Sequence, residues 1–345
     1  MANEQSIIMN PAEYAAKIVN QTSRHIFLTG KAGTGKTTFL RNIILKTHKK
    51  TIVVAPTGIA AINAGGVTIH SQFQLPFGPF VPSKAFSVNS ILQFKVNNPD
   101  SLFKNFQMSG KKRQLLRAVE LLIIDEVSML RADLLDAIST VMKFVRRNQQ
   151  SCGGVQVLFI GDLLQLPPVV KDEEWQLLRN YYKSIYFFDA QALLDSKPIY
   201  IELDKIYRQS DQTFINLLNN FRNNEVEQDD MELLNRHYKP NFKPPVEENY
   251  ITLTTHNAKA DAINKKALDE LHVKSHYFQA LISGEFSEYA HPVEKYMELK
   301  VGAQVMFIKN DLNVEKKFFN GKLATIEKID EKDIMAVSYT HLTLP

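Results

Sequence analysis

A glycine-rich turn near the start of the chain has residue types that bind phosphate. The run Gly30–Thr37 reads GKAGTGKT and fits the pattern G-x-x-x-x-G-K-[ST] in full. Glycines let backbone N–H groups point at phosphate oxygens, and the start of a following helix adds partial positive charge. Lys36 would reach the β- and γ-phosphates, and the Thr37 hydroxyl would ligate Mg²⁺. The predicted nucleotide-binding residues are Gly30, Lys31, Ala32, Gly33, Thr34, Gly35, Lys36, Thr37 and Thr38.

Two adjacent acids supply the second half of such a site. Asp125 and Glu126 follow the apolar run Leu121–Ile124. Asp125 would hold Mg²⁺, directly or through water, and Glu126 would take a proton from the attacking water as general base. Alone, the pair could equally be two solvated acids at a strand end, but the phosphate-binding turn favours the catalytic role. Together the motifs predict ATP or GTP hydrolysis without separating a motor from a switch or a kinase.

The elements that must position these residues are strands that alternate with helices. Apolar, β-rich runs recur at His25–Leu28, Thr51–Ala55, Leu121–Ile124, Val155–Ile160 and Ile199–Leu203. Helical patterns lie between several of them, for example at Thr37–Thr47 and Arg131–Arg146. Buried strands that alternate with helices predict an α/β fold with a doubly wound, mostly parallel sheet. The strand before the glycine turn and the helix after it disfavour a chance glycine loop.

The alternation of strands and helices is interrupted once inside this first domain, and the pattern changes again after it. The aromatic and proline-containing stretch at about 71–110 has no clean period, so we expect an inserted subdomain there. We expect a helix at Ser210–Asn224 and a new strand at Ile251–Thr255 that opens a second α/β unit. Beyond residue 298 the pattern of alternating strands indicates a small β-barrel. The predicted domains are therefore residues 1–205, 206–297 and 298–345.

Composition narrows the class of protein. The 345 residues carry 41 basic and 37 acidic side chains, a net charge of +4 that permits nucleic acid as a partner without demanding it. The single cysteine, Cys152, excludes a disulfide framework and a cysteine-based zinc site. The N-terminus lacks the basic and apolar regions of a signal peptide, and no apolar run reaches the roughly 18 residues of a membrane span. We expect a cytoplasmic protein, nucleoid-associated if bacterial, that contacts no membrane.

Further motifs indicate which process the hydrolysis of the nucleotide drives. The segments APTGIAAINAGGVTIHS, IIDEVSML, GDLLQLPPV and YRQSD occur in this order. Their order resembles superfamily 1 helicases, and most of all the Pif family of 5′-to-3′ DNA helicases, with RecD-like and Dda-like relatives. The resemblance runs from about Ile26 to Ile326. It implies a P-loop NTPase with a RecA-like doubly wound sheet, a second RecA-like domain and an inserted barrel of the Src-homology-3 type. It also implies ATP and Mg²⁺ as cofactors.

The resemblance assigns roles to two more residues. Gln165 matches the family glutamine that senses the γ-phosphate and bonds the attacking water; otherwise it is an ordinary loop residue. Arg208 matches an arginine that reaches the γ-phosphate, where such a group is worth roughly 10³–10⁵ in rate. Its alternative role is a surface salt bridge. The predicted catalytic residues are thus Lys36, Glu126, Gln165 and Arg208.

The resemblance also implies a track for single-stranded DNA. The matching residues are Pro56, Thr57, Gly58, His70, Ser71, Thr255, His256 and Asn257. Backbone N–H groups and hydroxyls there would hold phosphates without sequence preference. Phe77 or Phe80 could stack on a base or split the duplex, and the alternative for each is a small hydrophobic core of the insertion. His70 could equally be a structural histidine.

Parts of the family pattern are missing. A late Ser-, Gln- and Gly-containing segment and a final arginine motif do not occur before the end, IMAVSYTHLTLP. We therefore expect a truncated chain with an incomplete second RecA-like domain, which binds ATP–Mg²⁺, hydrolyses it weakly if at all and does not unwind duplex DNA. The family's adenine contacts have no clear match, although Asn20 and Gln21 lie in the right region.

Two other functions stay open. One is a single-stranded-DNA-binding module that uses ATP as a conformational switch and has no motor activity. The other is a P-loop kinase or an ATPase that acts on protein, which the APTG and GDLLQLPPV segments disfavour. The expected partners are single-stranded DNA and forked duplex DNA, protein partners are unknown, and we expect a monomer.

Overall fold

The computed structural model describes residues 10–83, 95–104, 108–240, 242, 250–281, 294–308, 311, 317–318, 322–330 and 333–338. Parts of the predicted insertion, the proline-rich segment before Ile251 and the C-terminal end fall outside these ranges. The chain divides into two compact units, Met1–Leu234 and Asn235–Pro345.

A six-stranded sheet forms the centre of the first unit. Its strands are β1 (Ile26–Gly30), β2 (Thr51–Ala55), β3 (Val67–Thr68), β4 (Leu121–Ile124), β5 (Gln156–Ile160) and β6 (Ile199–Leu203). They lie in the order β3-β2-β4-β5-β1-β6, and every neighbouring pair is parallel. The five strands predicted from apolar runs are all present. The parallel α/β sheet is therefore confirmed.

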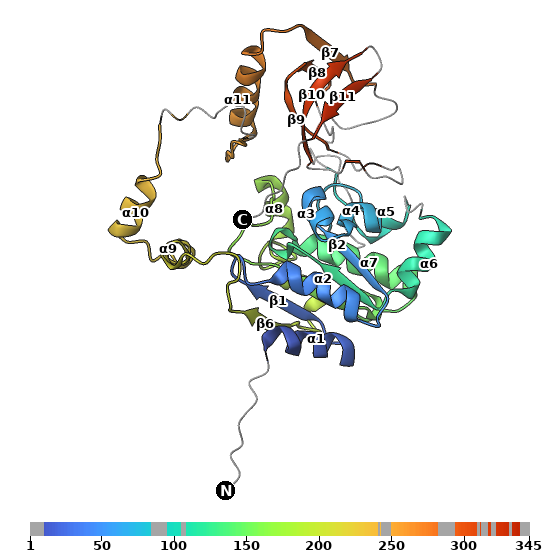
Figure 1. Ribbon diagram of the computed structural model, residues 1–345. Coiled ribbons are helices and arrows are strands. Elements are labelled where there is room, and N and C mark those ends of the chain that lie inside the picture. The colour runs from blue at the N-terminus through green and yellow to red at the C-terminus, as the bar shows by residue number, and fades with distance from the viewer. Residues whose placement is uncertain are drawn as a thin grey trace. The chain divides into compact units, whose positions relative to one another are not determined.

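Helices lie on both faces of this sheet (Figure 1). The described helices of the first unit are α1 (Pro11–Gln21), α2 (Lys36–Lys46), α3 (Gly58–Asn63), α4 (Ile69–Phe73), α5 (Pro99–Lys104), α6 (Gly110–Ala118), α7 (Ala132–Arg146), α8 (Asp172–Leu178) and α9 (Gln212–Asn223). The next helix, α10 (Gln228–Asn235), crosses the boundary between the two units and buries none of its residues. In β1, Ile26 and Leu28 pack against α1 and α2, while Phe27 belongs to the core that contains α7. Alternation of side chains along each strand thus feeds two cores, as expected for a doubly wound fold.

The longest helix, α7, shows why this arrangement is stable. Its buried residues Leu135, Ile138, Val141, Met142 and Val145 recur at helical spacing and face the sheet. The helix ends at Arg147, whose φ of 53° lies in the left-handed region typical of a helix C-terminus. The buried face of α7 therefore shares one core with β4 and β5, the strands that lead to the predicted site.

The described part of the predicted insertion does not form a core of its own. Phe73, Leu75, Phe80 and Leu102 join the same core as β4, β5 and α7. Phe80 is only 2% exposed, so the hypothesis that its ring stacks on a base is wrong. Phe77, by contrast, is 71% exposed. The irregular sequence does not indicate which of the two rings is buried, but the structure buries Phe80 and exposes Phe77.

The second unit is built differently from the first. It contains α11 (Asn257–Asp269), an antiparallel pair of β7 (Ser275–Gln279) and β8 (Tyr296–Lys300), and an antiparallel sheet of β9 (Gln304–Met306), β10 (Leu323–Ile329) and β11 (Ile334–Val337). The alternating strands predicted beyond residue 298 are therefore found.

The predicted strand at Ile251–Thr255 is wrong. These residues are largely exposed and belong to no strand. Their β-branched side chains favour an extended chain, but a strand also needs a hydrogen-bonded neighbour. The described residues of this unit include no parallel sheet, so a second RecA-like domain and the three domain boundaries remain predictions.

Candidate nucleotide and DNA site

Parallel strands bring the predicted functional residues to one edge of the first unit's sheet. The phosphate-binding turn follows β1, Pro56 follows β2, Asp125 follows β4, and Gly161 follows β5. Because all four strands are parallel, their carboxyl ends meet at the same edge. This edge is the usual place for ligands in an open α/β sheet.

The glycine turn is held close to the segment that follows β6. Gly33 has a φ of 82°, in the left-handed region. A β-carbon added to it would lie 2.7 Å from the Arg208 β-carbon. The Tyr207 N–H also donates to the Gly33 carbonyl at 2.8 Å. Arg208, predicted to reach the γ-phosphate, therefore lies against the turn that would hold it.

Lys36 is the first residue of α2 and faces inward. Its ammonium group donates to the carbonyls of Gly30 at 2.6 Å and Lys31 at 3.0 Å. Burial lowers the pKa of Lys36, and the nearby carboxylates of Asp162, Glu126 and Asp125 oppose that shift. A buried ammonium among acids is suited to neutralise phosphate charge.

The two predicted acids differ in their surroundings. Burial, reinforced by the charge of Glu126, raises the pKa of Asp125 to about 6, while the Glu126 backbone N–H and the Lys36 charge oppose the rise. The Asp125 N–H donates to the Val54 carbonyl of β2 at 2.9 Å, which fixes this carboxylate at the sheet edge. Glu126 has a φ of 51°, a costly backbone conformation for a side chain other than glycine. Such conformations cluster at functional sites.

A buried ion pair completes this edge. Asp162 follows β5 and is 1% exposed. Its carboxylate pairs with Arg222 of α9 and also accepts the Leu164 N–H. The Asp162 carbonyl accepts the Gln165 N–H at 2.9 Å, which anchors the Gln165 backbone while its side chain stays exposed. Sequence analysis missed Arg222, and the only hint was an aspartate directly after a buried strand.

The donor set present suits magnesium. Mg²⁺ usually takes one or two protein oxygens and completes its shell with water and substrate phosphates. The Thr37 hydroxyl, in the first turn of α2, and the Asp125 carboxylate are such oxygens. Within the described ranges no group of three or more His, Cys, Asp or Glu side chains could hold a metal ion. A site that shares its ion with nucleotide phosphates requires no such group.

The predicted DNA residues of the first unit lie on short helices. The Thr57 hydroxyl accepts the Ala60 N–H at 3.3 Å and so caps α3, directly after Pro56 and before Gly58. His70 and Ser71 belong to α4, and the Ser71 carbonyl accepts a hydrogen bond from the Lys112 ammonium group. Burial and the charge of Arg131 lower the pKa of His70, while Asp133 opposes them. The ring of His70 is therefore neutral near pH 7.

An aromatic pair stands beside these residues. The rings of His70 and Phe77 are stacked, with centroids 5.0 Å apart and planes 24° apart. The loop that carries Phe77 is fixed further along, where the Phe80 N–H donates to the Asp133 carboxylate at 2.9 Å. Asp133 in turn receives two hydrogen bonds from Arg131, each 2.8 Å long.

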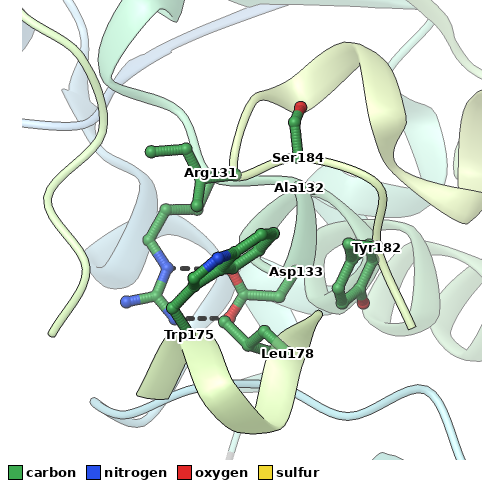
Figure 2. A pocket seen from close by; sticks show the side chains of 8 residues that line it. Arg131, Ala132, Asp133, Trp175, Leu178, Tyr182 and Ser184 are labelled. Atoms are coloured by element: carbon green, nitrogen blue, oxygen red, sulfur yellow. Dashed lines mark hydrogen bonds and ion pairs between the residues drawn. The ribbon is translucent and has the colours of Figure 1, made fainter. Parts of the chain in front are cut away.

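Figure 2 shows this Arg131–Asp133 pair with Trp175 of α8 beside it. The Arg131 guanidinium also donates to Glu174 of α8 at 2.9 Å. One arginine therefore joins the start of α7 to α8, and through Asp133 to the loop of Phe77. A planar guanidinium can hold two carboxylates at once, which fixes all three segments relative to one another.

The remaining predicted residues are Thr255, His256 and Asn257 of the second unit and Asn20 and Gln21 of the first. Thr255, His256 and Asn257 belong to the second unit, where the Thr255 hydroxyl lies 2.8 Å from His256 Nδ1 and Asn257 begins α11. Asn20 accepts a hydrogen bond from the Thr47 hydroxyl just after the end of α2, whereas the phosphate turn lies at the start of α2. Eleven helical residues span about 16 Å. Asn20 therefore has a structural role, and Gln21 beside it is exposed.

The sequence of this chain is similar to that of known DNA helicases. A family model described as PIF1-like helicase matches residues 1–232. The ATP-dependent DNA helicase PIF1 of Saccharomyces cerevisiae is 30% identical over 344 residues, which cover 94% of this chain and 35% of the yeast protein. This chain thus spans about a third of that relative's length. None of the described helices has the length and apolar character needed to cross a lipid bilayer.

Solved structures agree over nearly the whole chain. The Pif1 helicase from Bacteroides in complex with ADP-AlF3 and ssDNA is 38% identical, with a TM-score of 0.81, and the match covers 96% of this chain and 72% of that one. A structure described as DNA unwinding at forked dsDNA by two coordinating Pif1 helicases is 38% identical, with a TM-score of 0.80, and covers 96% and 73%. Because the family model matches two thirds of its residues, this chain belongs to the PIF1-like helicase family.

Proposed function

We propose that this chain carries the ATP-driven part of a Pif-type DNA helicase, which couples ATP hydrolysis to 5′-to-3′ movement on single-stranded DNA and to duplex unwinding. One observation carries the proposal. The phosphate-binding turn with Lys36, the acids Asp125 and Asp162, and the DNA-track segment after β2 all follow parallel strands and so meet at one edge of the sheet. The 5′-to-3′ direction of movement along the DNA is proposed from the family resemblance.

The chemistry divides among named groups. Lys36 and the backbone of the glycine turn hold the β- and γ-phosphates, and Thr37 and Asp125 hold Mg²⁺. Magnesium, when bound, neutralises charge on the phosphate oxygens. Glu126 accepts the proton of the attacking water, which Gln165 orients. Arg208, next to Gly33, stabilises the charge that develops in the transition state.

The DNA would lie across the first unit along Pro56–Gly58 and His70–Ser71, with Thr255–Asn257 contributed by the second unit. The Bacteroides relative is described in complex with ssDNA, and another relative with forked dsDNA, which supports these partners for this chain. Contacts to phosphates through backbone groups and hydroxyls give binding without sequence preference. We propose that one chain binds each DNA strand. Because the forked-DNA relative is described with two coordinating helicases, the number of chains bound per DNA molecule should be measured.

Phosphate release from ATP, measured with and without single-stranded DNA, tests the proposal. We expect the 345-residue chain to hydrolyse ATP slowly and without unwinding duplex DNA, single-stranded DNA to raise that slow turnover, and Glu126→Gln to abolish the rise. Turnover that ignores DNA would instead favour an ATPase that acts on protein. A change of DNA affinity on ATP binding with no phosphate release would favour the ATP-switched binding module.

A further inference from the structure

Helix α6 carries a concentration of positive charge. Its basic residues are Lys111, Lys112, Arg113 and Arg117, and it has no acidic residue. The whole stretch between Asp100 and Glu120 has five basic and no acidic residues, although the complete chain has a net charge of only +4. The rest of the chain is therefore close to neutral, and the excess positive charge lies in and around α6.

We propose that the basic surface of α6 binds the phosphate backbone of the duplex arm that adjoins the bound single strand. This inference rests on the proposed function, since it presumes that a single strand lies along the track of Pro56–Gly58 and His70–Ser71. It adds to that track a separate surface, which contacts the DNA where its two strands are still paired.

Hydrogen bonds place α6 beside the predicted track and hold it there. The Lys112 ammonium group, near the start of α6, donates to the Ser71 carbonyl of α4. The Arg146 guanidinium of α7 donates to three backbone carbonyls at or near the end of α6, the nearest at 2.7 Å. Figure 1 shows α6 beside α7 at the outer edge of the first unit. DNA that leaves the track at α4 therefore meets a surface that is already formed.

The charges on α6 are not balanced by carboxylates. Within the described residues, none of its four basic side chains forms an ion pair. Lys111 and Lys112 lie in the first turn, where the positive end of the helix disfavours cations. Arg113 and Arg117 stand four residues apart on one side of the helix and repel each other. The Arg113 Nε is buried and has no hydrogen-bond partner in the part of the chain that the structure describes. A bound anion would relieve all three.

The side chains that α6 exposes favour duplex over single-stranded DNA. The exposed residues of this helix are Gly110, Lys111, Gln114, Leu115, Arg117 and Ala118, and none is aromatic. Proteins hold single strands largely by stacking the bases on aromatic rings. In a duplex the bases are already stacked on one another, and lysine and arginine neutralise the phosphates. Nine helical residues span about 13 Å, the length of about four base pairs.

Binding to a tailed duplex tests the proposal. One probe is a single strand, and the other carries the same strand as a 5′ tail on a duplex arm, without a second tail. A chain that moves 5′-to-3′ on this tail approaches the arm. Fluorescence anisotropy over a salt series gives the affinity and its salt dependence for each probe. We expect Lys111→Ala/Arg113→Ala to reduce the salt slope on the tailed duplex by about 1.8, about 0.9 for each phosphate no longer neutralised, and to leave the slope on the single strand unchanged.

Two further double variants serve as controls. Lys17→Ala/Arg41→Ala removes the same charge from exposed positions of α1 and α2 and should leave both slopes unchanged. Lys111→Arg/Arg113→Lys keeps the charge of α6 and should bind both probes like the unmodified chain. Thermal melts verify that every variant is folded.

The outcomes separate this proposal from the proposed function. If Lys111→Ala/Arg113→Ala behaves like Lys17→Ala/Arg41→Ala on the tailed duplex, the α6 surface is overturned and the proposed function stands. An equal loss of slope on both probes would assign the α6 cations to the single strand and overturn the duplex arm as their partner. Failure of the unmodified chain to bind the single strand would overturn both proposals.

Discussion

Arg222 Nη1 lies 2.5 Å from Asp162 Oδ2, and this ion pair fastens α9 to the end of β5. Asp162 is almost completely buried, so its charge depends on this arginine for compensation. The pair also stands next to Lys36, whose pKa responds to both partners in opposite directions. The balance of charge around Lys36 therefore depends on Arg222, which belongs to no recognised sequence motif.

Arg222→Ala should destabilise the first unit. It leaves Asp162 buried without a partner, and breaking a buried pair in this way costs about 3–5 kcal/mol. Denaturant unfolding of the two variants measures the difference, with Arg179→Ala, an exposed arginine at the end of α8, as the matched control. The double variant Arg222→Ala/Asp162→Asn should recover part of the loss. Equal stability of Arg222→Ala and the control would show that solvent already screens the pair.

Lys36→Ala and Glu126→Gln should fail in different ways. Without Lys36 the phosphates lose their main counter-charge, so nucleotide affinity should fall along with hydrolysis. Without the Glu126 carboxylate only the base is lost, so binding should persist while turnover falls about 10²–10⁴-fold. Titration with a fluorescent nucleotide and a phosphate-release assay separate the two effects. An equal loss of nucleotide affinity in both variants would refute the division of roles.

Single-stranded DNA should bind with strong salt dependence and little sequence preference. The logarithm of the binding constant should fall with the logarithm of salt concentration by about 0.7 per phosphate neutralised. His70→Ala should weaken binding without changing this slope, because burial keeps the His70 ring neutral near pH 7. Fluorescence anisotropy over a salt series measures both quantities. A slope reduced by about 0.7 in His70→Ala would mean that the histidine binds as a cation.

The parts of this molecule that sequence predicts well are those fixed by local pattern. Buried strands such as Leu121–Ile124 are short apolar runs, and the glycine turn has few alternatives for its spacing. Long-range pairing is different. Arg222 is the only charged residue in α9 and finds Asp162 across 60 residues, which no local pattern encodes.

The same distinction explains the errors. Ile251–Thr255 has strand-like composition, but it pairs with no strand in the described part of the chain, and β-propensity alone does not make a strand. Phe77 and Phe80 stand three residues apart in an irregular loop, without a period to tell which faces the core. Contacts between distant segments hold Phe80 inward: its N–H donates to Asp133, and its ring packs in the core that contains α7.

The contribution of His25 to the stability of the first unit should fall as pH falls from 6.5 to 4. His25 is 4% exposed, and its Nδ1 accepts the Val157 N–H at 3.0 Å, so the ring must be unprotonated there. Burial lowers the pKa of His25 to about 4. Between that value and the unfolded value near 6.5, only the unfolded chain binds the proton at His25, so the His25 contribution drops by about 3 kcal/mol as pH decreases. Asp125, whose pKa burial raises to about 6, acts in the opposite direction.

His25→Asn removes the titrating group and isolates its effect. Other groups contribute equally to both proteins, so the difference between their pH–stability profiles reports His25 alone. Relative to the unmodified chain, the variant should gain stability as pH falls through this window. Parallel profiles would mean that the His25 ring accepts a proton in the folded chain as readily as in the unfolded chain.

The link between Arg131 and Asp133 should control the loop that presents Phe77. Asp133→Ala removes the acceptor for the Phe80 N–H and one of the two carboxylates that hold Arg131. Because both groups are largely buried, we expect a loss of about 3–5 kcal/mol in unfolding free energy. Asp133→Asn keeps an acceptor for the Phe80 N–H and should cost less. Asp172→Ala, an exposed acid at the start of α8, is the control.

The chain supplies its own probe for this prediction. Trp175 is the only tryptophan and lines the small pocket formed with Arg131 and Asp133 (Figure 2). Loosening the pair should admit water around the indole, so the emission of folded Asp133→Ala should shift to longer wavelength while the control stays unchanged. Single-stranded DNA should then bind more weakly, because the Phe77 loop loses its anchor. If Asp133→Ala lowers the unfolding free energy but leaves the Trp175 emission unchanged, the damage lies elsewhere in α7. If its Trp175 emission shifts but its DNA affinity is unchanged, the Asp133 anchor does not position Phe77.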